Sequence, residues 1–229
     1  MTLNYQFTQP RLLATIVFGI LLVAGCGNSS QAAMSLPSAK VDTPLATKKG
    51  EQIAVFSGGC FWGVEAVFEH VKGVNDAWSG YAGGSSVTAK YDIVSSGMTG
   101  HAESVKVSFD PSKVTYGELL KVFFSVAHDP TQLNRQGPDS GTQYRSAIFY
   151  TNAEQQRIAT AYIAQMSAAK TFPAKIVTQV NPLKAFYMAE DYHQDFARLN
   201  PSHPYIVYHD LPKVQNLKKQ FPQWYVAKY

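Results

Sequence analysis

A single thiol at the junction of two contrasting sequence patterns constrains this chain most. Residues 58–63 place Cys60 after two glycines and before two aromatic rings. The apolar run before it predicts a strand over residues 52–57, buried on both faces and therefore in the middle of a sheet. Apolar residues spaced three and four apart then predict a helix from residue 61 to near Gly73. Cys60 is therefore expected at a helix N-terminus, where free N–H groups and the helix dipole lower a thiol pKa and favour the nucleophilic thiolate.

The residues around this thiol also admit a purely structural interpretation. Free cysteines are often small buried apolar residues, but the strand, the glycine pair and the helix start favour an active site at Cys60. Phe61 shares the apolar stripe of the helix and could simply pack in the core. Trp62 lies off that stripe, so it is the better candidate for a ring exposed in a pocket.

A carboxyl group on an apolar strand face is the second candidate for chemistry. Residues 102–109 alternate, with Glu103 on the same face as Val105, Val107 and Phe109. A carboxyl in a low dielectric holds its proton to higher pH, so Glu103 is predicted to be a general acid near neutral pH. The alternative is a glutamate at the strand end that turns toward water.

The remaining patterns indicate one α/β domain over residues 51–229 without internal repeats. Polar residues 128–144 form a long loop, and such loops are often functional. The chain after residue 199 is rich in Pro and Tyr and is predicted to be a long irregular tail. Further strands are predicted over residues 74–81, 145–150 and, at a sheet edge, 176–180, and further helices over residues 116–127, 152–168 and, as a short patch, 190–199.

The N-terminal segment indicates export. Residues 12–24 are apolar except for Thr15. This apolar stretch is too short to span a membrane and has the length of a signal-peptide core. The segment ends in Leu-Val-Ala-Gly-Cys and resembles the lipobox of bacterial lipoproteins. A signal peptide over residues 1–25 and a lipid on Cys26 are therefore predicted, with an ordinary cleaved signal or an uncleaved anchor as alternatives. Residues 26–50 are predicted to be the lipidated cysteine and a flexible tether.

Charge and cysteine content exclude several kinds of site. The formal charge of +4 is spread along the chain, which predicts no nucleic-acid surface. With Cys26 assigned to the lipid, Cys60 has no partner for a disulfide. The His101-Ala102-Glu103 triplet matches the H-x-E of zinc deaminases, but the required P-C-x-x-C is absent and no metal site is predicted.

Two other function classes remain open on these patterns. Papain-like cysteine hydrolases also place a cysteine beside an aromatic residue, and His193 follows Cys60 at a compatible distance. However, His193 lies in a helical patch, and the local pattern before the papain-type cysteine is missing. The third class is a lipoprotein binding module in which the thiol is incidental.

Several motifs in the same order resemble the A-type peptide methionine sulfoxide reductases. The similarity runs from about residue 52 to residue 199, and several motifs together are more specific than any one of them. It implies a two-layer α/β sandwich with a ferredoxin-like core, reduction of the S epimer of methionine sulfoxide, and no metal or organic cofactor. The motifs are Gly-Cys-Phe-Trp-Gly at residues 59–63, Tyr91, Ser-Gly-Met-Thr-Gly-His-Ala-Glu at 96–103, His-Asp-Pro-Thr-Gln at 128–132 and the run at 134–146.

The resemblance implies a role for each candidate residue. The Cys60 thiolate would attack the sulfoxide sulfur while Glu103 protonates the oxygen, leaving methionine and a cysteine sulfenic acid. Tyr91 and Tyr144 would donate hydrogen bonds to that oxygen. Phe61 and Trp62 would hold the S-methyl group, and Asp139 would bind the backbone amide or amine of the substrate.

One departure from the family pattern affects the second half of the reaction. Many relatives carry a resolving cysteine where this chain has Ser95, or cysteines in the tail, and the mature chain has neither. The expected reductant is therefore external: a thioredoxin-like protein, a glutaredoxin-like protein or a small thiol. The expected enzyme is a monomer that repairs free or protein-bound methionine sulfoxide. It is expected to be lipid-anchored to a bacterial membrane in the cell envelope, and Gly27 lacks the acidic residue linked to inner-membrane retention, which favours the outer membrane, with its periplasmic side as the expected location.

Overall fold

The computed structural model describes residues 1–4 and 36–228. The chain divides into the units Met1–Ala32 and Ala33–Tyr229, and the second unit is the folded domain described below. Almost all of the predicted signal peptide, Cys26 and the first part of the predicted tether lie outside the described residues. Among the residues that are described, no helix combines the length and apolar character needed to cross a bilayer.

A six-stranded sheet with the order β7-β6-β1-β3-β2-β8 forms the centre of the domain. The strand before the thiol, β1 (Gln52–Gly58), pairs antiparallel with β3 (Ala102–Phe109) on one side and β6 (Ser146–Tyr150) on the other. The prediction of a buried strand in the middle of a sheet is confirmed, because Ala54, Val55 and Phe56 are fully buried. The outer strands are β2 (Val74–Ala82), β7 (Gln179–Pro182) and β8 (Phe186–Met188).

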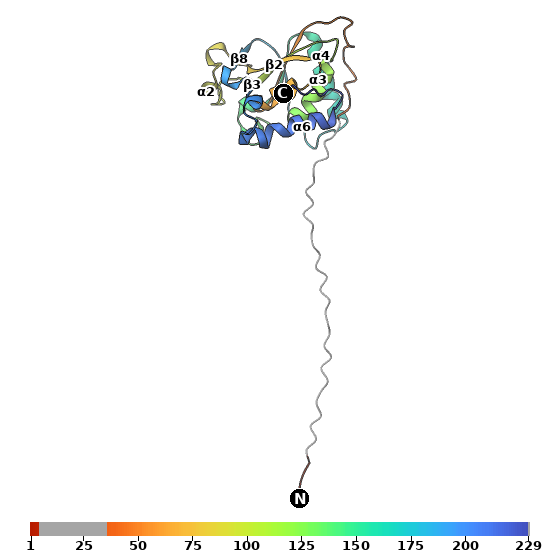
Figure 1. Cartoon of the computed structure of the whole chain (residues 1–229), viewed down its shortest axis with the longest axis vertical. Coiled ribbons are helices and arrows are strands. Elements are labelled where there is room, and N and C mark those ends of the chain that lie inside the picture. Colours follow the sequence, from red (N-terminus) through yellow and green to blue (C-terminus); the bar gives the residue numbers. More distant parts are fainter. Residues whose placement is uncertain (5–35, 229) are drawn as a thin grey trace. The chain divides into compact units, whose positions relative to one another are not determined.

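The connections give the ferredoxin-like core that the family resemblance implied. The chain runs β1, α1 (Phe61–Glu69), β2, β3, α3 (Tyr116–Val122) and β6, and the four strands lie in the order β6-β1-β3-β2 with antiparallel neighbours. A π-helical turn, η2 (Phe123–Ala127), extends α3, and α4 (Ala153–Ala168) leads to β7, which pairs parallel with β6. The labels in Figure 1 locate α3, α4 and α6 beside the strands.

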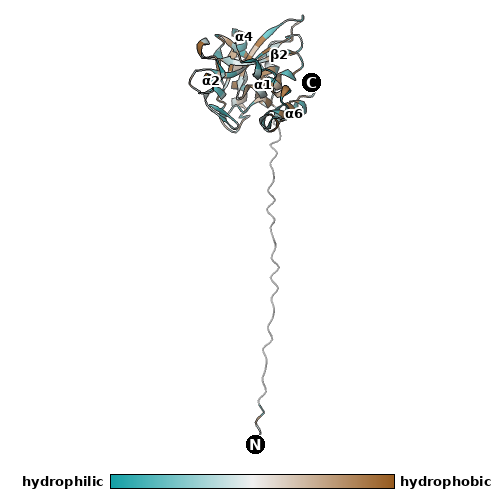
Figure 2. Ribbon diagram, turned by 60° about the vertical axis from the view of Figure 1, so that its left-hand side comes forward, coloured by the Kyte–Doolittle hydropathy of each residue, from teal (hydrophilic) through white to brown (hydrophobic). Residues whose placement is uncertain are grey.

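The main hydrophobic core lies between the sheet and the helices. The ring of Phe56 on β1 stacks against Phe68 of α1 and Phe123 at the end of α3, with ring centroids 5.0 Å apart in both pairs. Val55 is the next residue along β1, so it points to the opposite face and joins a smaller cluster with Phe149. Figure 2 shows apolar segments concentrated in the interior of the domain. β1 therefore anchors two cores at once, which holds the chain before Cys60 rigidly.

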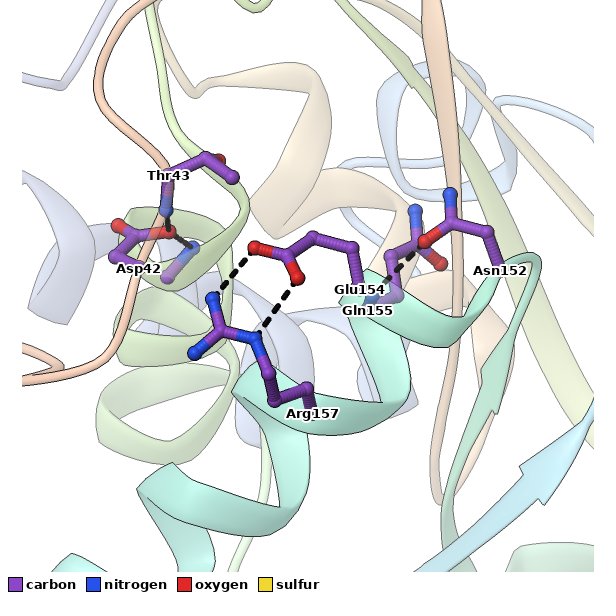
Figure 3. Close-up of polar contacts among 7 residues, drawn as sticks. Asp42, Thr43, Asn152, Glu154, Gln155 and Arg157 are labelled. Carbon is purple, nitrogen blue, oxygen red and sulfur yellow. Dashed lines mark hydrogen bonds and ion pairs between the residues drawn. The ribbon is translucent and has the colours of Figure 1, made fainter.

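Residues 36–46, called the N-terminal strap below, correct the predicted extent of the tether. Leu36 is 2% exposed within the main core, and its neighbour Pro37 accepts a hydrogen bond from the Tyr162 hydroxyl on α4 at 2.7 Å. The Asp42 carboxylate accepts from the Gly117 N–H at 3.0 Å and from the Thr115 hydroxyl at 2.5 Å, at the start of α3. Figure 3 shows the Asp42 carboxylate, which also accepts from the Thr43 N–H at 2.8 Å. The strap is therefore packed on the domain by burial of Leu36 and by hydrogen bonds to α3 and α4.

The tail is another correction, because its middle is helical. A π-helical turn, η5 (Ile206–Asp210), runs into α6 (Leu211–Gln220), and Ile206 and Leu217 are fully buried. The prolines of the tail suggested irregular chain, but Pro212 lies in the first turn of α6. Proline is tolerated there because its missing N–H would have no partner within the helix. The tail covers α1, and α6 is the blue helix at the lower edge of the domain in Figure 1.

Smaller differences concern short elements. The predicted edge strand is an edge strand, but it lies later in the chain, as β7, and extends to Pro182 instead of ending at residue 180. The predicted helical patch at residues 190–199 is split into two pieces by Asp195, which adopts a left-handed conformation. The short elements are η1 (Ser86–Thr88), α2 (Tyr91–Val94), β4 (Arg135–Gln136), β5 (Asp139–Ser140), η3 (Thr142–Tyr144), η4 (Asp191–His193) and α5 (Phe196–Leu199).

Candidate active site

A pocket of about 190 Å³ gathers all seven of the residues predicted to carry the chemistry, and it adds Tyr205. These residues come from α1, α2, β3, the loop after α3 and the tail, so no local stretch of sequence contains the pocket. A larger hollow of about 430 Å³ lies over residues 166–176, but its lining includes no cysteine, histidine or carboxylate. The lining residues of the smaller pocket are Cys60, Phe61, Trp62, Tyr91, Glu103, Asp139, Tyr144 and Tyr205.

A tight turn between β1 and α1 places Cys60. Gly59 has φ +91°, a conformation that other residues rarely adopt, and a Cβ at this position would lie 2.5 Å from the Gln136 side chain. Cys60 is the N-cap residue of α1, as predicted, although its side chain accepts no capping hydrogen bond. The turn therefore delivers the thiol to the first turn of the helix and into the pocket.

The predicted thiolate is not the resting state of Cys60. The side chain is 8% exposed, and burial raises the thiol pKa well above its ordinary value. The negative charges of Glu103 and Asp210 raise this pKa further, while the backbone N–H of Trp62 and the charge of Lys213 lower it. The helix N-terminus acts as predicted, but the loss of hydration is the larger effect. In the free enzyme Cys60 is therefore a thiol at neutral pH.

Glu103 is buried on the inner face of β3, as the strand alternation predicted. It is 2% exposed, and its Oε2 accepts a hydrogen bond from the Phe61 N–H at 3.0 Å. Burial is the main reason that its pKa rises to about 8, and the charges of Asp139 and Asp210 raise it further. The hydrogen bond from Phe61 acts in the opposite direction. Glu103 is therefore a neutral acid at pH 7 in the same pocket as the thiol.

A buried ion pair lies behind the first turn of α1. The Asp210 carboxylate is fully buried and receives the Lys213 ammonium group at 3.1 Å. Gly63 leaves room for it, because a Cβ at that position would overlap the carboxylate. Asp210 raises the pKa of both Cys60 and Glu103, so it helps to keep both groups protonated. The sequence did not single out this pair, because it lies in the predicted irregular tail.

Two tyrosine hydroxyl groups complete the polar side of the pocket. Tyr91 begins α2 and Tyr144 ends η3, and both side chains are half-buried. Burial, with the nearby charge of Glu103, raises the pKa of each. Both hydroxyl groups therefore keep their protons across the physiological range and can donate hydrogen bonds to an oxygen atom in the pocket.

The apolar wall consists of the two rings that follow Cys60. Phe61 is 1% exposed and belongs to the core, while Trp62 is half-buried, in agreement with the sequence analysis. Trp62 stacks on Phe196 with ring centroids 3.8 Å apart and an interplanar angle of 10°. It also meets Tyr205 edge-on at 5.9 Å. The wall is therefore supported by the tail of the chain.

Asp139 and Tyr205 form a hydrogen-bonded pair at the pocket, with the tyrosine hydroxyl donating to the carboxylate. Burial, followed by the charge of Cys60 and this hydrogen bond, raises the pKa of Tyr205. Sequence reasoning missed Tyr205, because the tail contains several tyrosines and no spacing distinguishes this one. The next residue, Ile206, is apolar in the sequence and fully buried in the structure. Its apolar side chain was the available signal that this part of the tail packs against the domain.

Arg145 holds together the loops that carry the pocket. Its guanidinium group donates to the carbonyl oxygens of Gly100, His101 and Thr142, each at 2.9 Å. The first two carbonyls precede Glu103, and the third precedes Tyr144. The planar group thus fixes the acid and one tyrosine relative to each other.

The two histidines considered in the alternative functions have structural partners. His101 uses Nδ1 to accept from the Gly84 N–H at 3.2 Å and Nε2 to donate to the Ser85 carbonyl at 2.9 Å. His193 accepts a hydrogen bond from the Trp62 indole, and no hydrogen bond joins it to Cys60. The described residues contain no cluster suited to a metal ion. The geometry therefore does not support a cysteine–histidine pair of the hydrolase type.

No resolving cysteine is present within residues 36–228, where Cys60 is the one free cysteine. Ser95 lies at the end of α2, and its hydroxyl donates to the Tyr91 carbonyl at 2.7 Å. The residue at this position therefore helps to hold the helix that carries Tyr91.

Comparison with known proteins gives a consistent result. The family described as peptide methionine sulfoxide reductase matches residues 52–225. A peptide methionine sulfoxide reductase of Mesorhizobium japonicum is 63% identical over 78% of this chain and 92% of the relative, and one of Synechocystis is 52% identical over 89% and 96%. Among solved structures, methionine sulfoxide reductase A of Corynebacterium diphtheriae has a TM-score of 0.59 and 37% identity over 69% of this chain and 78% of that chain. Reduced Mxr1 of Saccharomyces cerevisiae has a TM-score of 0.61 and 32% identity over 72% and 92%.

Proposed function

This chain belongs to the A-type peptide methionine sulfoxide reductases, and we propose that its Cys60 pocket takes the oxygen from methionine S-sulfoxide. The chain is an oxidoreductase that reduces methionine sulfoxide to methionine and so repairs oxidised proteins. The observation that carries the assignment of the site is the pairing of one buried thiol with one buried, neutral carboxyl group in the same pocket.

The pKa values of the two groups suggest how the proton moves. Cys60 and Glu103 are both protonated at neutral pH, since burial raises both pKa values. The Cys60 sulfur attacks the sulfoxide sulfur while Glu103 gives its proton to the sulfoxide oxygen, and the S–O bond of the substrate then breaks as that oxygen passes to the Cys60 sulfur. The thiol proton then restores Glu103. The products are methionine and a Cys60 sulfenic acid, so the sulfoxide is reduced by two electrons and the cysteine is oxidised by two.

The remaining lining residues orient the substrate in this proposal. Tyr91 and Tyr144 donate hydrogen bonds to the sulfoxide oxygen, and their raised pKa values keep these donors protonated. Phe61 and Trp62 receive the S-methyl group on the apolar wall. Asp139, oriented by the Tyr205 hydroxyl, binds the backbone amide or amine of the methionine. A chiral sulfoxide can match the oxygen side and the methyl side together in one configuration only, which supports selectivity for a single epimer, and the family resemblance implies that it is the S epimer.

An external thiol completes the catalytic cycle in this proposal. Cys60 has no cysteine partner among residues 36–228, so the sulfenic acid cannot be resolved as a disulfide within the described domain. A thioredoxin-like protein, a glutaredoxin-like protein or a small thiol attacks the sulfenic sulfur, water leaves, and a second thiol releases Cys60. The pocket needs no metal or organic cofactor for these steps.

A single turnover without reductant tests the proposal. Purified enzyme mixed with separated epimers of a methionine sulfoxide peptide should release about one equivalent of methionine from the S epimer, and Cys60 should gain one oxygen atom by mass spectrometry. Cys60→Ser is the control and should release none. Release of methionine without oxidation of Cys60, or equal turnover of both epimers, would contradict the assignment.

We also propose that the enzyme is exported and lipid-anchored, on the sequence pattern alone. The support is the short apolar core at residues 12–24 and the Leu-Val-Ala-Gly-Cys ending at Cys26. In cells, wild-type protein should fractionate with the membrane of the envelope, and Cys26→Ala should appear in the soluble fraction. A mature N-terminus other than an acylated Cys26 would rule out the lipid anchor.

A further inference from the structure

His193 is a buried histidine in contact with three residues of the pocket wall. It is 2% exposed, and its ring lies 4.4 Å from the Tyr91 ring and 4.9 Å from the Phe61 ring, centroid to centroid. The Trp62 ring is 5.8 Å away. His193 does not line the pocket itself. It therefore forms a layer behind the wall and reaches the substrate only through other side chains.

One directed polar contact joins this layer to the wall. The Trp62 Nε1–H donates a hydrogen bond to His193 Nδ1 at 3.1 Å. An indole N–H can only donate, so Nδ1 carries no proton and the neutral ring holds its proton on Nε2. Nε2 is buried and has no hydrogen-bond partner among the described residues. The link to Trp62 is thus the one hydrogen bond that orients the imidazole within the described domain.

The stacking contacts of Trp62 do not determine its orientation alone. Phe196 lies flat against the indole at 3.8 Å, and a stacked ring can slide or turn over while it keeps most of that contact. The hydrogen bond to His193 fixes the orientation of the indole, because it holds the edge that carries Nε1 against His193, behind the pocket wall. The opposite, apolar edge then faces the substrate side.

The charged group nearest to this contact is already committed to other partners. Glu190 accepts from the Tyr91 N–H at 3.0 Å with one oxygen and from the Tyr81 hydroxyl at 2.8 Å with the other. Its charge favours a protonated His193, but burial is the larger effect and lowers the His193 pKa. The imidazole therefore remains a neutral hydrogen-bond acceptor in the neutral pH range.

We propose that His193 is a positioning residue that fixes the Trp62 indole, and through it the apolar wall that receives the S-methyl group of the substrate. The role of the wall rests on the proposed function, but the His193–Trp62 link is a separate structural claim. His193 takes no part in proton transfer. It acts on substrate binding, so its loss raises KM more than it lowers kcat.

Two substitutions separate the hydrogen bond from the packing. His193→Phe keeps an aromatic ring and removes the acceptor, while His193→Asn removes the ring and keeps an oxygen at the position of Nδ1. His203→Phe is the matched control, because His203 meets the Trp62 ring edge-on at 6.3 Å and is exposed. The chain has three tryptophans, so nitrogen-15 labelling gives three indole N–H signals, and Trp62→Phe identifies the one from Trp62.

The expected results form one pattern. His193→Phe should raise KM for the S-sulfoxide by about five- to tenfold, the factor that a lost hydrogen bond typically gives, and should shift the Trp62 indole signal alone. His193→Asn should restore the signal and most of KM, and His203→Phe should change neither. Circular dichroism confirms that each variant is folded.

Three results would overturn the proposal. These are an unshifted Trp62 signal in His193→Phe, a KM that changes equally in His193→Phe and His193→Asn, or a loss confined to kcat. If the wild-type enzyme did not reduce the sulfoxide, the proposed function would fail, whereas the indole signals would still test the link between the two residues.

Discussion

Glu103 and Glu65 are buried to the same degree, but their surroundings differ. Glu103 is 2% exposed and Glu65 is 1% exposed, and burial raises the pKa of each to about 8. Each accepts one backbone N–H, from Phe61 at 3.0 Å and from Ser79 at 3.2 Å. Glu103 faces a pocket with a thiol and two tyrosine hydroxyls, whereas Glu65 faces Glu69 and the backbone of β2. Burial alone is enough to keep a glutamate protonated. The acid can serve in catalysis only where a nucleophile and hydrogen-bond donors lie beside it, as they do at Glu103.

The largest expected difference between the two glutamates is in catalysis. Glu103→Gln should lower the rate of methionine formation by about 10²- to 10⁴-fold, because the amide cannot give a proton to the leaving oxygen. Glu65→Gln is the matched control and should change that rate by less than about twofold. Single-turnover kinetics with the S-sulfoxide measures both. Equal losses in the two variants would show that burial, and not position, accounts for the effect.

The pH dependence of the rate should reveal the same difference. A group that must donate a proton is active below its pKa, so the single-turnover rate should be flat below about pH 8 and fall about tenfold per pH unit above it. Glu65→Gln should leave this profile unchanged. A rate that rises through pH 8 would mean that the Cys60 thiolate, formed in advance, is the reactive species.

Glu65 should have the smallest effect on activity, but it should make the stability of the protein depend on pH. The folded-state pKa of Glu65, about 8, lies above its unfolded value of 4.5, so the unfolded state ionises first as the pH rises. The free energy of unfolding should therefore fall between about pH 4.5 and pH 8 and level off above. At about 1.4 kcal/mol per pKa unit, the difference of 3.5 units between 4.5 and about 8 lowers the free energy of unfolding by about 5 kcal/mol.

Glu65→Gln should abolish this loss of stability at high pH, because glutamine carries no charge and still offers an acceptor to the Ser79 N–H. Urea unfolding at pH 5 and pH 9 should show a much larger gain in stability for the variant at pH 9 than at pH 5. An equal gain at both pH values would indicate better packing and not the loss of a buried charge.

Local patterns predicted the site residues that lie on regular elements. The alternation of β3 placed Glu103 inside the domain, and the change of period at Cys60 placed the thiol at the start of α1, because both depend on residues close in sequence. The direction of the Cys60 pKa was predicted wrongly. Helix position can be inferred from sequence, whereas the depth of burial depends on β3 and the tail, which are distant in the chain.

The parts that escaped prediction share one physical reason. Tyr205, Asp210 and His193 lie against Trp62 or Gly63 of α1, and their own surroundings in the sequence have no clear period. Asp42 was assigned to a flexible tether because its partners are N–H and hydroxyl groups at the start of a helix more than seventy residues away. Such end-on contacts leave no periodic signal in the segment that makes them.

The N-terminal strap also determines how the domain would respond to a mechanical load. A force applied upstream of Leu36 would meet its burial and the Tyr162 hydrogen bond first, and the Asp42 contacts with α3 next. These contacts would open one after another, as in peeling, before tension reached β1 at Gln52. The strap would therefore keep tension from the preceding chain away from β1, the strand that leads to Cys60.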